Sequence, residues 1–435
     1  MVKKIFCVFF AILILIVGIC PSASAYTPSD FEVESEAAYV ASLDTGAVLY
    51  EKNSNQKVYP AALTNIMTAV LLCENVEDLP GTVLTVPEEA FTLLLGTGAA
   101  ITGLKPDEQV TANDMLHAVI LNAAPDSAIT IAYHVSGGIP QFVELMNKKA
   151  KALGMKNTHF NNVSGLDDPN HYTTAKDIHT LSAYAANIAA IKEAAKLKRY
   201  TIPKTNKSAE RILSTSNYII DIATNYYYKY ATGFKTGYTD NAGRCLVATA
   251  SYEGYSYICV LMKAPNKVGN RAEFKDAANI FRWAFTGFEY KTVVRTDELI
   301  GEIPVELAWD IDHITLYPEK DVSALLPKEA DSSTITTEFD FDIKKSIDAP
   351  IKKGQKIGTG TIFYAGEKLG KVNIIAGESV KRNAYLGFAR LLRNIFTSTL
   401  FRALLIIAAL IVLGFILFVI YINSKKRRRK GVHKW

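Results

Sequence analysis

The alternation of apolar and polar residues predicts a mixed helical and stranded architecture up to about residue 290. Apolar residues alternate on both sides of the turn Asp44-Thr45-Gly46, which predicts a β-hairpin over residues 37–50. A continuous apolar stretch predicts a buried helix at residues 63–72. Residues 114–134 and 139–153 also have helical periodicity, so we expect several helices in this part of the chain.

Strands are expected closer to residue 290. Strand patterns recur at residues 235–238, 245–251 and 255–262. Before these runs, Thr174 and Asp177 have the spacing of a capping box at the start of a helix that extends to Ile188. After them, aromatic and alanine residues recur at helical spacing from Phe274 to Phe285. Helices around an antiparallel sheet give an α+β fold class.

A different pattern begins after Tyr290. From Ile335 to Ile343, apolar residues alternate with threonine and charged residues, which predicts a half-exposed strand. Residues 349–355 form a turn-rich connector. We therefore expect a small all-β domain over residues 291–379, which spaces the main domain from a membrane.

The membrane itself is indicated by residues 403–422, an uncharged run long enough to cross a bilayer at ~1.5 Å per residue. The basic tail that follows, residues 423–435, is expected in the cytoplasm by the positive-inside rule. Before the run, residues 380–402 place Tyr385 and Phe388 on one face, which predicts an interfacial amphipathic helix. A buried helix is the alternative for the apolar run, but its length and basic flank favour a transmembrane helix.

The N-terminus has the features of a secretory signal peptide. Lys3 and Lys4 precede an apolar run, and residues 23–25 form an A-x-A cleavage site. Cys20 suggests a lipoprotein as the alternative, but the bulky isoleucine before it does not fit a lipobox. We expect cleavage after Ala25, which leaves a main domain over residues 26–290.

The formal net charge of +5 comes from the two ends of the chain. Two lysines near the start and seven basic residues after Ile422 exceed this total, so the body between them is net acidic. Nucleic-acid binding by the body is therefore not expected. Cys73, Cys245 and Cys259 have no metal-ligand or C-x-x-C spacing, so we expect buried free thiols rather than a disulfide framework.

Five sequence segments, in this order along the chain, indicate a more specific fold. They are residues 41–51, 59–68, 157–160, 164–172 and 233–239. The last contains Lys235-Thr236-Gly237, a K-T-G strand motif. This motif alone is weak evidence for a family, but its occurrence with the other four segments is specific. Together the segments resemble the low-molecular-mass serine D-alanyl-D-alanine carboxypeptidases, penicillin-binding proteins that trim peptidoglycan stem peptides. The resemblance covers about residues 37–377 and implies a transpeptidase-like domain.

The same resemblance implies that several catalytic positions of this chain lack the reactive side chains of the family. The family's S-x-x-K motif places a serine nucleophile one helical turn before a lysine base. Ala62 stands at the serine position and Asn65 at the lysine position. Alanine has no oxygen to acylate, and an asparagine amide is not a useful base. The family's S-x-N motif corresponds to residues 123–125, so Ala123 and Pro125 replace its serine and asparagine.

Rescue by another nucleophile is an alternative to an inactive site. Thr64 and Cys73 lie on the same predicted helix as Ala62, but their displacement along it takes them away from the original position. His159 and His171 flank two aspartates without a compact metal-ligand spacing. We expect a structural role for both histidines, and neither a metal nor an organic cofactor.

Lys235, Thr236 and Gly237 are the retained part of the site. In the family, the lysine and threonine hold the terminal carboxylate of D-Ala-D-Ala, and the glycine lets the substrate backbone approach. An isolated lysine on a strand is more often simply solvated, but the surrounding motifs favour substrate binding by these three residues.

The sequence therefore predicts a membrane-anchored, extracytoplasmic and catalytically inactive carboxypeptidase-like protein that binds peptidoglycan stem peptides or a cell-wall partner. An active carboxypeptidase that uses unrecognised residues is one alternative. A scaffold whose cleft binds nothing is the other.

Overall fold

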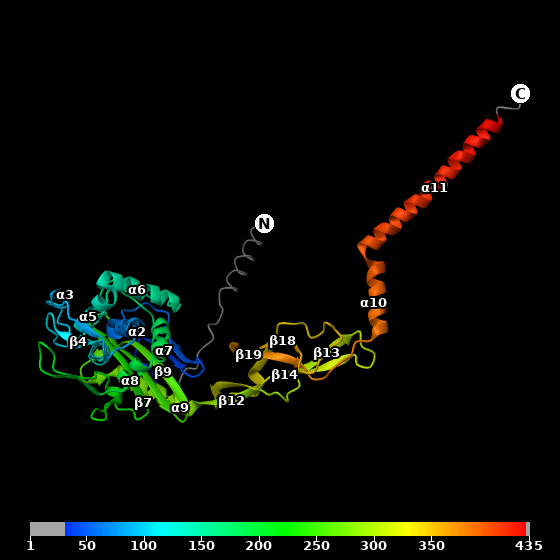
Figure 1. Ribbon diagram of the computed structural model, residues 1–435. Helices are drawn as coiled ribbons and strands as arrows, with labels where there is room; N and C mark the ends of the chain where they lie inside the picture. Colours follow the sequence, from blue (N-terminus) through cyan, green and yellow to red (C-terminus); the bar gives the residue numbers. More distant parts are fainter. Residues whose placement is uncertain (1–30, 432–435) are drawn as a thin grey trace, which may run out of the picture. The chain divides into compact units, whose positions relative to one another are not determined.

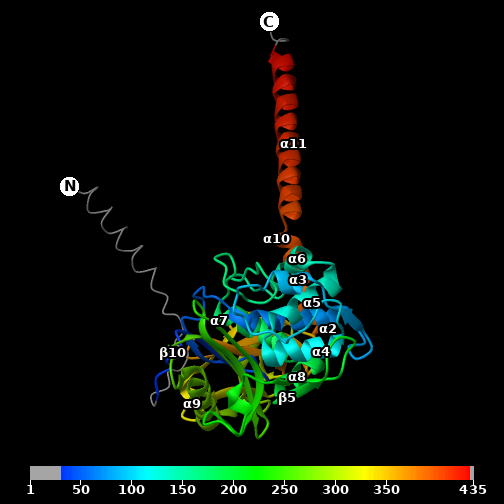
Figure 2. The same cartoon turned by 90° about the vertical axis from the view of Figure 1, so that its left-hand side faces the viewer.

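The computed structural model describes residues 31–431, which divide into two compact units (Figures 1 and 2). The first contains the described residues up to Tyr290 together with Leu325–Ala330. The second contains Lys291–Ala324 and the residues from Asp331 onward. The expected signal peptide, residues 1–25, lies outside the described residues.

A five-stranded antiparallel sheet forms the centre of the first unit. Its strand order is β2-β1-β9-β8-β7, so β7 is an edge strand. The bounds are β1 (Ala37–Ser42), β2 (Val48–Lys52), β7 (Ala231–Thr239), β8 (Gly243–Tyr252) and β9 (Tyr255–Ala264). Three short strand pairs accompany this sheet: β3 (Val83–Thr85) with β4 (Gln109–Thr111), β5 (Arg199–Ile202) with β6 (Arg211–Ser214), and β10 (Asn266–Lys267) with β11 (Asn270–Arg271).

Helices cover both faces of the central sheet, because successive residues of its strands point to opposite sides. On one face, α9 (Ala272–Gly287) packs against β8 and β9, and Val40 and Cys259 belong to this cluster. On the other face, Ala41 and Val260 pack with the remaining helices. These are η1 (Ala61–Thr64), α2 (Asn65–Asn75), α3 (Glu89–Thr92), α4 (Ala112–His117), η2 (Ala118–Asn122), α5 (Pro125–Ser136), α6 (Ile139–Ala152), α7 (Ala175–Ala185) and α8 (Ala189–Lys196). A short 3₁₀ turn, η3 (Tyr218–Ile220), precedes β7 and belongs to the α9 side of the sheet.

Most elements predicted before residue 290 are confirmed. The hairpin over residues 37–50 is the β1–β2 pair, and the helix at residues 63–72 is η1 followed by α2. The three predicted strands are β7, β8 and β9, each longer than predicted. Cys245 and Cys259 are buried free thiols on β8 and β9, whereas Cys73 is only partly buried.

The single helix predicted over residues 114–134 is wrong in one respect, because the structure breaks it in two. Ala123 has a left-handed backbone (φ 57°) between η2 and α5. Pro125, at the first position of α5, has no N–H group to continue an earlier helix. The apolar periodicity continues through this turn, which is why the pattern alone did not reveal it.

The Thr174 cap is present, but the predicted box is only half formed. The Thr174 side chain accepts a hydrogen bond from the backbone N–H of Asp177, as expected. The Asp177 carboxylate instead accepts hydrogen bonds from the Asn157 N–H and the Thr158 hydroxyl. Helix α7 ends at Ala185, before the predicted end at Ile188, which precedes α8.

The second unit is built on a six-stranded sheet of order β16-β18-β19-β14-β13-β17. The bounds are β13 (Gly301–Glu306), β14 (His313–Pro318), β16 (Ile335–Phe339), β17 (Ile347–Asp348), β18 (Lys356–Tyr364) and β19 (Glu367–Ala376). A 3₁₀ turn, η4 (Ser332–Thr334), precedes β16, and β12 (Phe288–Val294) pairs with β15 (Val322–Pro327). The expected β-rich C-terminal domain is thus confirmed, although the strand predicted to reach Ile343 ends at Phe339.

Two helices end the described chain. Helix α10 (Ala384–Thr397) exposes an apolar face that includes Tyr385 and Phe388, while Arg390 pairs with Asp348 of β17 and Glu306 of β13. Helix α11 (Thr399–Gly431) contains the predicted apolar run. Among residues 31–431 it is the one helix that is long and apolar enough to cross a membrane, over Thr399–Lys425.

Candidate functional site

A cleft of about 960 Å³ in the first unit collects most of the predicted site residues. Its walls come from η1, the η2–α5 turn, the edge strand β7 and the β7–β8 turn. Ala62, Ala123, Pro125, Thr236 and Gly237 all line it. The other lining residues are Thr97, Gly98, Ala99, Ala100, Asn122, Ser164, Gly165, Leu166, Asp167, Ser216, Tyr238, Thr239, Asp240, Asn241, Arg244 and Arg271. Segments that are far apart in the sequence thus meet at one concave surface.

Ala62 lies on η1, where two glycines allow neighbouring backbone to approach closely. A Cβ atom added at Gly165 would lie 1.8 Å from the carbonyl oxygen of Ala61. A Cβ atom added at Gly237 would lie 3.0 Å from the backbone nitrogen of Ala62. Strand β7 and the loop around Gly165 therefore pack directly against η1. Ala62 is half-buried and lines the cleft.

Asn65 begins α2 and lies beneath the cleft rather than on its surface. Its side chain is fully buried, and its Nδ2 donates a long hydrogen bond of 3.5 Å to the carbonyl oxygen of Val119. Its Oδ1 atom has no hydrogen-bond partner among the described residues. A buried, neutral amide cannot take a proton from a group in the cleft, so this position supplies no general base.

Thr64 and Cys73, the two alternative nucleophiles, are not among the residues that line the cleft. The Thr64 hydroxyl lies 2.8 Å from Nε2 of His171, whose Nδ1 accepts hydrogen bonds from the N–H groups of Asn161 and Asn162. Burial lowers the pKa of His171 to about 4, so this ring is neutral and its Nε2–H donates to Thr64. Burial also raises the pKa of Cys73 to about 11.

The turn with Ala123 and Pro125 is fixed by a buried carboxylate next to it. Asp126 accepts hydrogen bonds from the backbone N–H groups of Thr102 and Leu104, at 2.9 and 3.4 Å to Oδ2. Burial raises the pKa of Asp126, although these bonds oppose the shift. The carboxylate thus connects the start of α5 to the end of the loop that forms one cleft wall.

Lys235 does not reach the surface of the cleft. Its side chain is fully buried, and its Nζ donates to the backbone oxygen of Thr236 at 2.8 Å. Burial lowers the pKa of Lys235 to about 7. Thr236 and Gly237 do line the cleft, and the hydroxyl of Ser216 is hydrogen-bonded to that of Thr236. Of the three residues expected to bind substrate, Thr236 and Gly237 line the cleft and Lys235 does not.

Sequence reasoning missed the two arginines of the cleft. Arg271 donates from Nε to Glu273 at 2.6 Å and stacks over the ring of Tyr218. The guanidinium carbon of Arg244 lies 5.2 Å from the centroid of the Tyr238 ring. Neither arginine belongs to a recognisable motif. Only the pairing of β7 with β8, which places Arg244 opposite Tyr238, could have indicated the second.

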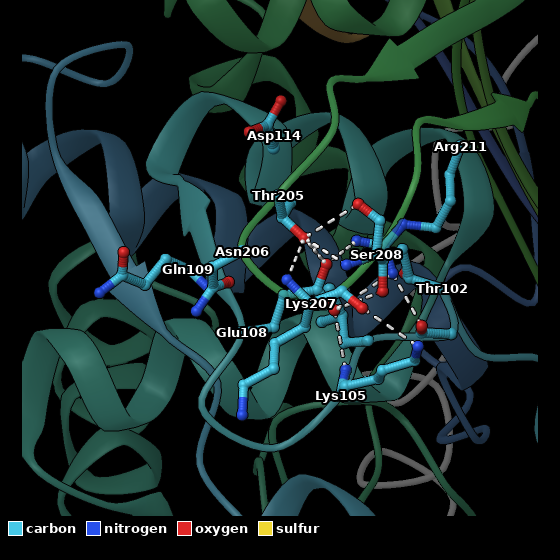
Figure 3. Close-up of polar contacts among 12 residues, drawn as sticks. Thr102, Lys105, Glu108, Gln109, Asp114, Thr205, Asn206, Lys207, Ser208 and Arg211 are labelled. Atoms are coloured by element: carbon cyan, nitrogen blue, oxygen red, sulfur yellow. Dashed lines mark hydrogen bonds and ion pairs between the residues drawn. The ribbon is translucent and has the colours of Figure 1, made fainter.

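A second polar network centres on Glu108, Thr205 and Arg211 (Figure 3). The side chain of Glu108 is fully buried and pairs with Arg211 at 2.5 Å, while Arg211 also donates to the carbonyl oxygen of Gly103 at 2.7 Å. Thr205 donates a further hydrogen bond to Glu108 at 2.6 Å. Burial would raise the pKa of Glu108, but the bonds from Thr205 and Arg211 outweigh it and lower that pKa. The loop after β5 is thereby fastened to the segment before β4.

Two segments of the chain match known protein families. Residues 23–266 match the family described as D-alanyl-D-alanine carboxypeptidase, and residues 288–382 match the C-terminal domain of penicillin-binding protein 5. The D-alanyl-D-alanine carboxypeptidase DacF of Bacillus subtilis is 30% identical over 87% of this chain and 95% of its own length. DacC of Escherichia coli, of the same description, is 29% identical over 82% of this chain and 86% of its own length.

Solved structures agree with these matches. Penicillin-binding protein 5 from Haemophilus influenzae superposes with a TM-score of 0.61 at 27% identity and covers 82% of this chain and all of that one. The carboxypeptidase DacD from Francisella tularensis has a TM-score of 0.64 at 22% identity, over 82% of this chain and 96% of its own, which is a likeness of fold. The α+β expectation for the main domain is therefore confirmed.

Proposed function

Because this chain belongs to the D-alanyl-D-alanine carboxypeptidase family, we propose that it is a membrane-anchored member that binds peptidoglycan stem peptides without hydrolysing them. Peptidoglycan metabolism follows from the family. Different residues support the loss of hydrolysis and the retention of peptide binding.

The loss of hydrolysis rests on Ala62. Acyl transfer needs a nucleophile, a base that takes its proton and donors for the oxyanion. Ala62 carries only a methyl group on the cleft wall, and Asn65 is a buried amide. Ala123 and Pro125 replace two further polar groups that the reaction uses in the family. With four positions changed together, a single substitution cannot account for the pattern.

Binding of a stem peptide is supported by cleft residues that are not needed for hydrolysis. Thr236 offers a hydroxyl, and Gly237 leaves the edge of β7 open to an approaching backbone. Arg244 and Arg271, which line the cleft, provide positive charge near a bound peptide carboxylate. Hydrogen bonds that Asp126 and Glu108 accept hold the segment after one cleft wall in place. Such bracing is consistent with a site whose shape still matters.

The direct test is incubation of the detergent-solubilised full-length protein with a fluorescent penicillin, followed by intact-mass spectrometry. We expect no increase in mass, because Ala62 has no oxygen to acylate. A stoichiometric adduct that disappears on changing Thr64 or Cys73 would establish instead an active enzyme that uses an unrecognised nucleophile.

Titration with a stem-peptide analogue ending in D-Ala-D-Ala separates the proposed binding from a scaffold role. We expect saturable binding that is lost when the terminal carboxylate is converted to an amide. An absence of binding by either analogue would favour a scaffold that presents its surface to a cell-wall partner.

The membrane arrangement is part of the same proposal. Helix α11 is long and apolar enough to cross a bilayer, and a run of lysines and arginines follows its apolar run. The positive-inside rule then places the tail in the cytoplasm and the two units outside it, where the peptidoglycan lies.

A further inference from the structure

A second pocket adjoins the cleft at the end of β7. It has a volume of about 420 Å³ and is lined by Lys57, Val58, Tyr59, Pro169, Tyr172, Asn241 and Lys263, a set that we call the outer pocket. Asn241 lines both the cleft and the outer pocket. Tyr59 lies three residues before Ala62, so the same segment of chain contributes to both cavities. The two therefore form one continuous surface.

The direction of a bound peptide follows from the edge strand. Strand β7 pairs only with β8 in the described sheet, so its other edge can add an extended peptide as a further strand. Strand β7 lines the cleft only from Thr236 to Thr239, followed by the turn at Asp240 and Asn241, and none of residues 231–235 lines it. A peptide whose terminal carboxylate lies at Thr236 and that stays within the cleft therefore extends toward Thr239. Its preceding residues then reach Asn241 and the outer pocket.

The charges in the outer pocket are suited to an anion. Lys57 is exposed, its Nζ lies 4.0 Å from the centroid of the Tyr172 ring, and it has no carboxylate partner in the described part of the chain. Lys263, by contrast, is paired with Glu36 at 2.8 Å. Asp167, which lines the adjoining cleft, accepts hydrogen bonds from Thr239 and Asn241 at 2.6 and 3.0 Å. Lys57 is therefore the cation of the pocket that remains available to a ligand.

We propose that the outer pocket binds the upstream, carboxylate-bearing part of the stem peptide, with Lys57 as the partner of that carboxylate. The rings of Tyr59, Tyr172 and Pro169 then contact the apolar atoms of the same segment. This inference rests on the proposed function, because it assumes that the D-alanyl end occupies the cleft. In addition to the D-alanyl end, the protein would then recognise the upstream part of the stem peptide.

Calorimetry with the full-length protein in detergent can test the proposal with three peptides. One is a pentapeptide, L-Ala-γ-D-Glu-L-Lys-D-Ala-D-Ala, with a free glutamate carboxylate. The second carries an amide in place of that carboxylate, and the third is diacetyl-L-Lys-D-Ala-D-Ala, which lacks the glutamate and its carboxylate. We expect the charged pentapeptide to bind roughly three- to fivefold more tightly than the amide, which is the upper range for a partly exposed ion pair.

The Lys57→Met variant should remove this preference and leave the affinity for the tripeptide unchanged. Lys148→Met, at an exposed lysine on α6, is the matched control and should keep the preference. If the wild-type protein binds all three peptides equally, or if Lys57→Met retains the preference, the outer pocket does not bind the upstream carboxylate and the proposed function still stands. If no peptide binds at all, the proposed function fails as well.

Discussion

At the scale of single residues, the two positions of the S-x-x-K motif give a repair experiment. Ala62→Ser combined with Asn65→Lys should restore slow acylation by penicillin, because the surrounding walls are in place. Ala62→Ser alone should do almost nothing, since groups that act as one unit are strongly non-additive. Intact-mass spectrometry after timed incubation measures both variants.

Hydrolysis of a peptide should need more substitutions than acylation by penicillin. It should also require Ala123→Ser and Pro125→Asn, because release of the leaving group uses the second motif in the family. Full turnover by the Ala62→Ser protein alone would mean that Asn65 is not the inactive position that its burial implies.

Lys235 gives a pH-dependent prediction. Its pKa is about 7 in the folded protein, against 10.5 for a free lysine, so the unfolded chain binds more protons between these values. The free energy of unfolding should therefore rise with pH from about 7 to about 10.5 through this group. Lys235→Met should be more stable than the wild type at pH 7, by up to ~5 kcal/mol, with the difference vanishing above pH 10.5. Urea denaturation at several pH values measures it, and parallel curves for the two proteins would contradict it.

At the scale of elements, the contact between η1 and the loop at Gly165 can be tested by adding one methyl group. Gly165→Ala should destabilise the protein by about 2–4 kcal/mol, because the new Cβ meets the backbone of Ala61 as well as a left-handed φ of 86°. Gly46→Ala is the matched control, since Gly46 has a φ of 75° with nothing within 4 Å. It should cost about 1 kcal/mol. Equal losses in chemical denaturation would mean that the close approach contributes nothing.

Some helices and strands could be predicted from the sequence, and others could not. Strands β8 and β9 were predictable because their apolar runs are buried on both faces of the sheet, whereas β7 was located by its K-T-G motif. The break at Ala123 was not, because it depends on a left-handed alanine inside a continuous apolar pattern. Arg244 and Arg271 were not predictable either, since their place in the cleft depends on β7 and β8 pairing and on the start of α9. Motif spacing located the emptied positions, whereas burial of Lys235 required the packed structure.

At the scale of the whole molecule, the proposed topology predicts a protease experiment. Protease added outside intact cells should digest the two extracytoplasmic units, whereas an epitope tag placed after Trp435 should stay protected, because α11 separates them. Permeabilised cells serve as the control, in which the tag must become accessible. Digestion of the tag in intact cells would reverse the orientation.

Helix α11 has a further consequence for affinity. A chain held at a membrane by one helix explores only a thin layer of solution beside that surface, and the peptidoglycan peptides within its reach occupy the same layer. Tethering of this kind commonly gives local concentrations on the order of millimolar. A cleft that binds a stem peptide weakly in a test tube would still be largely occupied there. In the proposed arrangement, anchoring by α11 therefore lowers the intrinsic affinity that the cleft must supply.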